Sequence, residues 1–484
     1  MQACHLAVDI GASSGRHIVG SVKEGKIFLN EVYRFENRLY KKNGHLCWDL
    51  NRLFDHILTG ILECQKQGFF PSTMGIDTWA VDYVMLDKKG HILGDSIAYR
   101  DSRTDGIRER LEQEGFMSFD EHYKRTGIQY QKFNTIYQLA AVQKESPDLI
   151  AQAEDFLMIP DYLNYLLTGT KVNEYTNATT TALVNATTKD WDTEIISRLG
   201  LPQKIFKKIS LPGIVLGNFT PEIQKQTGTN MKVVLPATHD TGSAFLSVPA
   251  KDDSAVFLSS GTWSLMGVEN PFPITNQESC RFNFTNEGGY DYRFRCLKNI
   301  MGLWMIQSVK KELVNRKEIQ NYWFQGRDIT PSFSEFSQSA KKETSYQAVL
   351  DVNDGRFLAP DSMCQEVQNA CRDCGLPEPT NIGQLVQCIY QSLAEDYRRT
   401  IQLLSRLTGK SYTCLHIIGG GCQDMLLNQM TANATGLPVY AGPVEGTALG
   451  NLIVQFIHAK EFSNLQEARD SIRQSFEIKK ILPE

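Results

Sequence analysis

Long apolar runs are missing from this chain of 484 residues, and so is a recognisable secretory leader. No stretch reaches the roughly 18 to 20 apolar residues that a membrane-spanning helix requires. The N-terminus, Met-Gln-Ala-Cys-His-Leu, contains no lysine or arginine, and Asp9 interrupts the apolar core that a leader would need. The sequence therefore predicts a cytoplasmic protein with no membrane partner.

A strong excess of either charge is also absent. The chain has 50 Lys and Arg against 55 Asp and Glu, a formal net charge of -5. It lacks the basic surplus that marks a nucleic-acid-binding surface. Its hydrophobic share of 42% and charged share of 22% are those of an ordinary globular protein. Nucleic acid is therefore not an expected partner, and the oligomeric state is left open.

The cysteines show no metal-binding pattern. All eleven are scattered between Cys4 and Cys422, an odd count that suits free thiols in a reducing compartment. Cys371-Arg-Asp-Cys374 is the single CxxC, and Cys364 precedes it in the same stretch. These three thiols can share a helix face, but no second CxxC or CxxH supplies a fourth zinc ligand. We interpret them as structural thiols and leave any pairing open.

Low-complexity tracts are sparse, so we expect the whole chain to be folded. A chain of 484 residues exceeds what one core usually fills, which predicts two domains of roughly 200 to 250 residues with a working cleft between them. The polar segment 248–254 contains Pro249 and separates an expected helix after Asp240 from an expected strand. The predicted domains are 1–248 and 255–484.

Alternating strands and helices predict an α/β protein in which helices flank the sheets. Apolar patterns bounded by turns indicate strands at 4–10, 16–22, 26–34, 73–86, 255–259 and 414–418. Helical spacing indicates helices at 51–67, 134–144, 160–167, 300–315 and 380–407. A helix-rich region is expected at about 103–205.

Three polar turns follow predicted strands. They are 9–16 (Asp-Ile-Gly-Ala-Ser-Ser-Gly-Arg), 259–262 (Ser-Ser-Gly-Thr) and 419–421 (Gly-Gly-Gly). Glycine and serine turns of this kind present backbone N–H groups to phosphate oxygens. The strand-turn-strand pattern of the N-terminus recurs at 255–268, which indicates a divergent duplication.

The segment Val234 to Ser243 leads an apolar strand into a polar turn, His239-Asp240-Thr241-Gly242-Ser243. A carboxylate held at such a turn can take a proton from a sugar hydroxyl. A lone aspartate at this place is more often a helix cap. The phosphate-type turns in the same chain favour the catalytic interpretation of Asp240.

Together, the turns at 9–16, 259–262 and 419–421 resemble the nucleotide-binding elements of the actin, hexokinase and sugar-kinase superfamily. Within it, 239–243 resembles the catalytic-base motif of the FGGY carbohydrate kinases. Further blocks in a similar order span almost the whole chain, at 75–79, 99–103, 174–181, 258–267 and 298–304. The resemblance implies two actin-like (ribonuclease H-like) domains, each a mixed sheet flanked by helices, with an interdomain cleft.

The resemblance also implies roles for individual residues. Asp240 would be the general base, and Asp9 would orient a magnesium ion, usually through water. The sugar pocket would be lined by Ala80, His239, Asp240, Thr241 and Asn299. ATP would be contacted by Ala12, Ser13, Ser14, Gly15, Arg16, Thr262, Gln307 and Gly420.

The activity implied by the resemblance is ATP-dependent phosphorylation of a small ketose, L-rhamnulose, at O1. Alternatives are a kinase for another deoxyketose such as L-fuculose, or a non-enzymatic actin-like sugar sensor. A repressor-type sensor would usually carry a helix-turn-helix, and we expect none here. The chain departs from the family pattern where Ala80 replaces a glycine. The extra methyl group could narrow the pocket and restrict the range of substrates.

Each of these residues also has an ordinary structural interpretation. Arg16 can be a solvated strand residue, Thr262 a turn hydroxyl and Gln307 an exposed helix position. His239 can be a helix cap beside Asp240. A catalytic carboxylate at Asp240 must face the cleft, however, and this favours a sugar contact for the adjacent His239. Trp263 is predicted to be a core aromatic.

Overall fold

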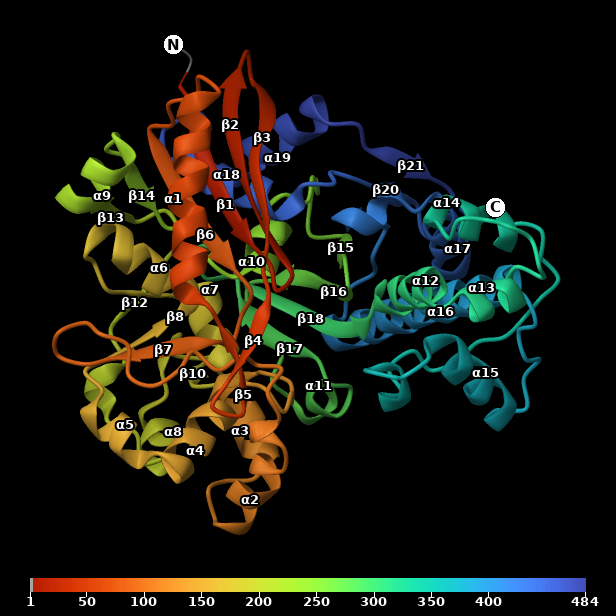
Figure 1. The fold of residues 1–484 in the computed structure, drawn as a ribbon, viewed down its shortest axis with the longest axis horizontal. Coiled ribbons are helices and arrows are strands. Elements are labelled where there is room, and N and C mark those ends of the chain that lie inside the picture. The colour runs from red at the N-terminus through yellow and green to blue at the C-terminus, as the bar shows by residue number, and fades with distance from the viewer. Residues whose placement is uncertain (1–2) are drawn as a thin grey trace. The chain divides into compact units, whose positions relative to one another are not determined.

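The computed structural model describes residues 3–484, which form two compact units. The first unit consists of the chain up to residue 253 together with 269–297 and 445–476. The second consists of 254–268, 298–444 and 477–484. Each unit contains a mixed sheet with flanking helices, which confirms the predicted fold class (Figure 1).

A six-stranded sheet forms the centre of the first unit, in the order β13-β14-β6-β1-β2-β3. β1 pairs antiparallel with β2 and parallel with β6. Because successive side chains of a strand point to opposite faces, Leu6 and Val8 join one core and Ala7 joins another. The strands are β1 (His5–Ile10), β2 (Ser14–Lys23), β3 (Lys26–Glu36), β6 (Thr73–Thr78), β13 (Val215–Asn218) and β14 (Lys232–Val234).

Helices cover both faces of this sheet (Figure 1). The helices α1 (Leu50–Lys66), α6 (Ile159–Thr168) and α9 (Pro221–Thr227) contribute apolar side chains to the core that contains Val8. The helices α18 (Gly446–His458) and α19 (Leu465–Ser475) do the same for the core that contains Ala7. The first unit is therefore a three-layer α/β/α structure, and α10 (Asp240–Leu246) packs against α18.

A helix-rich region lies between β6 and β13 in the chain and has its own core around Leu139 and Phe156. Its helices are α2 (Ile107–Gln113), α3 (Phe119–Thr126), α4 (Thr135–Glu145), α5 (Pro147–Gln152), α7 (Tyr175–Ala178) and α8 (Thr193–Arg198). Its strands are β7 (Tyr83–Leu86), β8 (Asp155–Met158), β9 (Asn173–Glu174), β10 (Val184–Asn185), β11 (Asp190–Trp191) and β12 (Ile209–Ser210). The first unit also includes β4 (Leu39–Lys42), β5 (His45–Trp48), α11 (Gln277–Arg281) and β17 (Thr285–Gly288).

The second sheet, most of whose strands belong to the second unit, has the order β17-β18-β16-β15-β19-β20-β21. Besides β17, its strands are β15 (Ala255–Ser260), β16 (Trp263–Asn270), β18 (Phe294–Met301), β19 (Cys414–Ile418), β20 (Val439–Ala441) and β21 (Lys479–Ile481). The helices of the second unit are α12 (Trp304–Asn315), α13 (Lys317–Trp323), α14 (Phe333–Ala340), α15 (Met363–Asp373), α16 (Ile382–Thr408) and α17 (Met425–Thr435).

The hairpins β1–β2 and β15–β16 are built alike. In each, the first strand pairs antiparallel with the second and parallel with a later strand, which is β6 in one case and β19 in the other. The turn of the first hairpin is closed by a bond from the Gly11 amide to the Ser14 carbonyl at 2.9 Å. The second is closed by a bond from the Gly261 amide to the Trp263 carbonyl at 3.0 Å. The geometry matches the recurrence seen in the sequence.

Two predicted elements differ from those observed. The sequence predicts one strand over 73–86, but the backbone turns at Val81 (φ 67°) and gives β6 and β7 in separate sheets. Asp82 follows this break, and its buried carboxylate accepts bonds from the indole Nε1 of Trp48 and Trp79 at 2.6 and 2.9 Å. The helix predicted from residue 300 begins only at Trp304, since β18 continues to Met301.

All eleven cysteines are free thiols, and Cys364 and Cys371 lie on the buried face of α15. Within residues 3–484, no helix is both long enough and apolar enough to cross a bilayer. Over the same range, no three His, Cys, Asp or Glu side chains are grouped so that they could hold a metal ion.

A close helix contact in the first unit predicts a stability effect. A Cβ at Gly450 of α18 would lie 1.7 Å from the carbonyl oxygen of Ser243 in α10. Gly450→Ala should therefore lower the free energy of unfolding by about 1–3 kcal/mol, as measured by urea denaturation. Gly355→Ala is the matched control, because nothing lies within 4 Å of a Cβ built there. Equal stability of the two variants would contradict this packing.

Candidate active site

Asp240 lies in the first turn of α10, and His239 is the N-cap residue before it. The positive end of the helix dipole stabilises a carboxylate at this position. Oδ1 accepts hydrogen bonds from the Thr241 amide at 2.6 Å and hydroxyl at 3.1 Å, and lies 3.3 Å from Nε2 of His239. All of these contacts fall on Oδ1, and the side chain is 31% exposed. Among the described residues none contacts Oδ2, which is therefore available to a ligand.

Three carboxylates come together beside α10. Asp9 of β1 and Asp77 of β6 are direct partners in the parallel register, and β6 ends in a bridge to His239. Burial, and then the charge of Asp9, raise the pKa of Asp77 well above that of an ordinary aspartate. Asn451 opposes this rise by donating to Oδ2 of Asp77 at 2.6 Å. Burial also raises the pKa of Asp240, while His239 opposes that rise and Asp9 adds to it.

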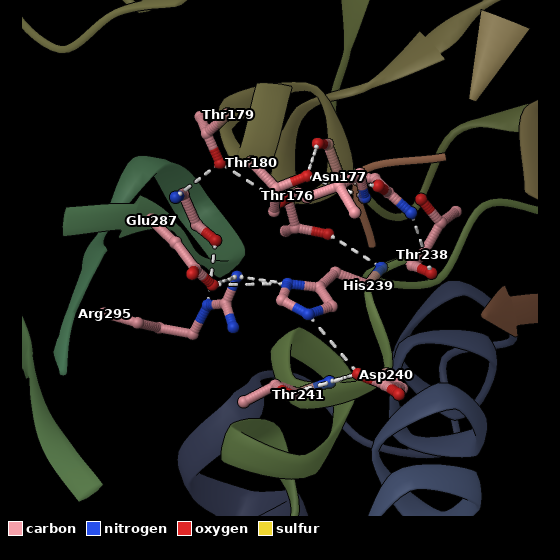
Figure 2. Close-up of polar contacts among 12 residues, drawn as sticks. Thr176, Asn177, Thr179, Thr180, Thr238, His239, Asp240, Thr241, Glu287 and Arg295 are labelled. Atoms are coloured by element: carbon pink, nitrogen blue, oxygen red, sulfur yellow. Dashed lines mark hydrogen bonds and ion pairs between the residues drawn. The ribbon is translucent and has the colours of Figure 1, made fainter. Parts of the chain in front are cut away.

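The His239 ring is contacted at both of its nitrogens (Figure 2). Besides Asp240 at Nε2, it has Arg295 Nη2 at 3.1 Å and Glu287 Oε2 at 3.3 Å from Nδ1. Glu287 and Arg295 form an ion pair of 3.1 Å between β17 and β18. Burial raises the pKa of Glu287, but Arg295 and His239 together lower it by more, so that the net shift is downward. The downward shift favours the charged form of the Glu287 carboxylate beside Arg295.

Glu174 connects the segment 174–181 to Thr238, which lies between β14 and α10. Its buried carboxylate accepts bonds from the Thr238 amide and hydroxyl at 3.0 and 2.8 Å. It also accepts bonds from the Thr176 amide and hydroxyl at 2.9 and 2.6 Å. The Thr176 hydroxyl accepts a bond from the His239 amide at 3.3 Å (Figure 2). The block at 174–181 thus supports the backbone of the Asp240 turn.

Arg16 is paired with two carboxylates in the first unit. Its Nε and Nη2 donate to Oδ2 of Asp9 at 2.9 and 2.8 Å, and its Nη1 lies 2.5 Å from Oε2 of Glu445. Its side chain is 24% exposed. Arg16 is therefore not a freely solvated strand residue, because its guanidinium is held at the same sheet edge as Asp9.

The turn between β1 and β2 combines exposed and packed positions. Gly15 is buried, and a Cβ there would lie 2.2 Å from the ring of Phe35. By contrast, Gly11 has no heavy atom closer than 3.5 Å to such a Cβ. The remaining predicted contacts of this turn are at least partly exposed: Ala12, Ser13 and Ser14.

Ala80 lies in the loop that follows β6. The Thr78 amide donates to the Thr238 carbonyl at 2.9 Å, and the Trp79 amide donates to the Ile10 carbonyl at 3.2 Å. These bonds hold the loop beside the end of β1 and the segment that precedes α10. Ala80 is partly exposed at this edge. It belongs to the same unit as His239 and Thr241.

The second unit holds the other predicted residues. The Thr262 hydroxyl donates to Oε1 of Gln307 at 3.4 Å, and the Trp304 amide donates to the Thr262 carbonyl at 3.1 Å. Gly420 has open space where a Cβ would lie. Asn299 lies on β18, where its buried Oδ1 has no hydrogen-bond partner among residues 3–484. The two bonds of Thr262 fix the hairpin turn of β15–β16 to the start of α12.

Sequence reasoning missed Asp77, Glu287, Arg295 and Asn451. Arg295 had one available signal, because a charged residue within the apolar run Phe-Arg-Cys-Leu needs a buried partner. Asn451 had none, since its contact with Asp77 joins residues 374 positions apart.

Paired sheets with matched hairpin turns, and a carboxylate presented at a helix N-terminus, are features of a sugar kinase. The chain belongs to the FGGY family of carbohydrate kinases. The N-terminal domain of that family matches residues 4–247, and its C-terminal domain matches residues 256–459. The protein is therefore an ATP-dependent carbohydrate kinase.

Full-length relatives share a more specific name. The chain is 47% identical to the rhamnulokinase of Oceanobacillus iheyensis over 99% of this chain and 98% of that protein. It is 48% identical to the rhamnulokinase of Halalkalibacterium halodurans over 98% of each chain. It is 42% identical to the rhamnulokinase of Bacillus subtilis over 99% of this chain and 95% of that protein.

Solved structures share the fold at low identity. A gluconate kinase from Lactobacillus acidophilus superposes with a TM-score of 0.80 at 17% identity, covering 100% of this chain and 94% of that one. A ligand-bound xylulose kinase from the same organism gives 0.80 at 18% identity with the same coverage. The glycerol kinase of Plasmodium falciparum, solved with ADP, gives 0.78 at 15% identity over 99% and 94% of the two chains.

The geometry of Asp240 predicts the effect of removing its charge. Asp240→Asn keeps the side-chain shape but cannot accept a proton, so kcat for sugar-dependent ADP release should fall by about 10² or more while ATP binding persists. Asp55→Asn on the exposed side of α1 is the control and should leave kcat unchanged. Near-normal turnover by Asp240→Asn would exclude Asp240 as the base.

The open turn at Gly261 predicts an effect on the nucleotide. A Cβ there would meet the Trp263 carbonyl at 3.8 Å, an ordinary contact, so the fold should tolerate a side chain. Gly261→Val should nevertheless raise the KM for ATP or abolish turnover, because the side chain blocks close approach of a phosphate to the backbone. Circular dichroism tests the fold, and Gly355→Val is the control. An unchanged ATP dependence in folded Gly261→Val would remove this turn from the nucleotide site.

Proposed function

We propose that this kinase phosphorylates L-rhamnulose at O1, giving L-rhamnulose 1-phosphate and ADP, as a step of L-rhamnose catabolism. The observation that carries the substrate assignment is the identity of 47% and 48%, over nearly the full length of both chains, to two rhamnulokinases. The similarity extends over 98–99% of this chain, so it is not confined to one domain.

Asp240 is the proposed general base. Its Oδ1 is held by Thr241 and faces His239, whereas Oδ2 is open to an acceptor hydroxyl. Proton removal by a carboxylate fixed in this way contributes typically about 10² to 10⁴-fold to the rate. A base fixed at one point serves one hydroxyl in line with the γ-phosphate, which supports transfer to a single oxygen of the sugar.

The proposed contacts to ATP are distributed over both units. In the first, the partly exposed turn 12–14, Gly15 and Arg16 would contact phosphates through backbone N–H groups and a guanidinium. In the second, Thr262, Gln307 and Gly420 would contact the nucleotide. These assignments follow the family resemblance, and the open space at Gly420 supports them.

Asp9 is the proposed residue that orients magnesium. Mg²⁺ keeps several waters and is usually bound by only one or two carboxylates together with substrate phosphates, so a single carboxylate at the sheet edge fits such an ion. When bound, the ion would neutralise charge on the phosphate oxygens. Asp9 would orient it through water, and Arg16 fixes the position of Oδ2 of Asp9.

The proposed sugar contacts are Ala80, His239, Asp240, Thr241 and Asn299. Ala80, His239 and Thr241 lie in the first unit with Asp240, on elements joined by the backbone bonds of Thr78. Asn299 stays a prediction supported by its unpaired Oδ1 in the second unit. The methyl group of Ala80 would reduce the room for larger or differently shaped ketoses.

A panel of ketoses tests the assignment in one coupled assay with Mg-ATP. L-rhamnulose should give the highest kcat/KM, and the product should carry phosphate at O1. L-fructose adds a C6 hydroxyl where the pocket expects a methyl group, and should lose about ten to a few hundredfold, since apolar pockets reject such a change weakly. L-fuculose misplaces a hydroxyl and should lose more if the site hydrogen-bonds that group.

Ala80→Gly is the matched variant for this panel, because it removes only the methyl group that departs from the family pattern. It should narrow the differences between the three sugars. A clear preference of the unmodified protein for L-fuculose, or phosphate at a carbon other than C1, would overturn the L-rhamnulose assignment while leaving the kinase activity in place.

A further inference from the structure

The residues around His239 determine which of its ring nitrogens can carry the proton. Arg295 Nη2 lies 3.1 Å from Nδ1 with hydrogen-bond geometry. A guanidinium has only donors, so this bond requires a lone pair on Nδ1. The hydrogen of the neutral ring must then be on Nε2, which lies 3.3 Å from Oδ1 of Asp240. In this tautomer, His239 donates to the proposed base.

The opposite tautomer would have a different partner. Glu287 Oε2 lies 3.3 Å from Nδ1 and could accept a hydrogen from it. The Nε2 lone pair would then face the carboxylate oxygen of Asp240, and the two would repel each other. Arg295 and Glu287 thus favour opposite tautomers of the same ring, and only the tautomer favoured by Arg295 supports an ionised Asp240.

The backbone fixes this competition in favour of Arg295. Glu287 and Arg295 are direct partners in the antiparallel register of β17 and β18. Arg295 is almost fully buried, and its Nε donates to the Gly288 carbonyl at 2.9 Å, which clamps the guanidinium beside the ring. Glu287 is 3.1 Å from the same guanidinium, so its charge is already compensated. A compensated carboxylate competes weakly for the hydrogen on Nδ1.

We propose that Arg295, held by Glu287, is a positioning residue that fixes His239 as its Nε2–H tautomer and thereby orients Asp240 as an ionised base. Glu287 has the secondary role of neutralising the buried guanidinium. The catalytic part of this inference rests on the proposed function of Asp240, whereas the tautomer itself can be observed in the absence of any sugar.

Nitrogen-15 NMR of histidine-labelled protein measures the tautomer directly. At about pH 8, where an ordinary imidazole is neutral, the His239 signal should be that of the Nε2–H form. His239→Gln identifies the signal by its loss. In Arg295→Met no donor reaches Nδ1, so Glu287 should accept its hydrogen and the signal should change to the Nδ1–H form. The kcat of this variant should fall by about 10- to 100-fold, with the KM for ATP changed less than about twofold.

Two further variants separate this role from a general loss of structure. Arg293→Met removes an arginine two positions away that pairs with Asp253 at 2.9 Å, outside the His239 network, and should change neither the tautomer nor kcat. The double variant Arg295→Met/Glu287→Leu replaces the buried ion pair by apolar side chains, a change that folds usually tolerate. With neither charge at Nδ1, Asp240 alone acts on the ring, so the Nε2–H form should return and part of kcat should be recovered.

An Nδ1–H ring in the unmodified protein would overturn the proposal, as would an Nε2–H ring retained in Arg295→Met. If Arg295→Met fails to fold, the unmodified protein and the double variant still decide the outcome, and an Nδ1–H ring in either overturns it. Failure of the proposed function looks different. In that case the unmodified protein turns over no ketose while the tautomer still switches as described.

Discussion

The parallel pairing of β1 with β6 is the constraint on which the candidate site depends. Its register sets Asp9 directly beside Asp77, and the end of β6 bridges to His239 at the start of α10. Three carboxylates are thereby brought to one sheet edge by backbone hydrogen bonds. Neighbouring negative charges that are shielded from water repel one another. The fold must therefore supply each carboxylate with its own donor or positive charge.

The compensations differ, and this difference separates the roles of three identical functional groups. Asp9 is held by the guanidinium of Arg16, which donates two bonds to its Oδ2. Asp77 is buried with only a neutral amide of Asn451 as donor, and its pKa is raised well above the ordinary value. Asp240 has a helix N-terminus and His239, and its side chain is 31% exposed, against 8% for Asp9 and 0% for Asp77. In our proposal, environment and not residue type distinguishes Asp240 as the base.

Local patterns were sufficient to predict most of the elements that carry the site. The strands β1 and β15, the helix α10 and both hairpin turns follow from apolar alternation and from glycine and serine in the turns, because these signals act over a few residues. The break between β6 and β7 could not be predicted in this way. It lies beside Asp82, whose carboxylate accepts a bond from Trp48, 34 positions away, and no pattern within either segment records that contact. Asn451 could not be predicted for the same reason, because it contacts Asp77, which is 374 positions away in the chain.

The substrate has to be encoded in side chains and not in the architecture. A gluconate kinase, a xylulose kinase and a glycerol kinase share this fold with TM-scores of 0.78 to 0.80 at only 15–18% identity, and their names give three different acceptors. A scaffold common to several acceptors can align a phosphate with a hydroxyl, but it cannot decide which sugar offers that hydroxyl. We therefore propose that residues near Asp240, such as Ala80 and Thr241, determine which sugar is accepted. In our proposal, the buried pair of Glu287 and Arg295 adds a further constraint, because it holds the His239 ring beside Asp240.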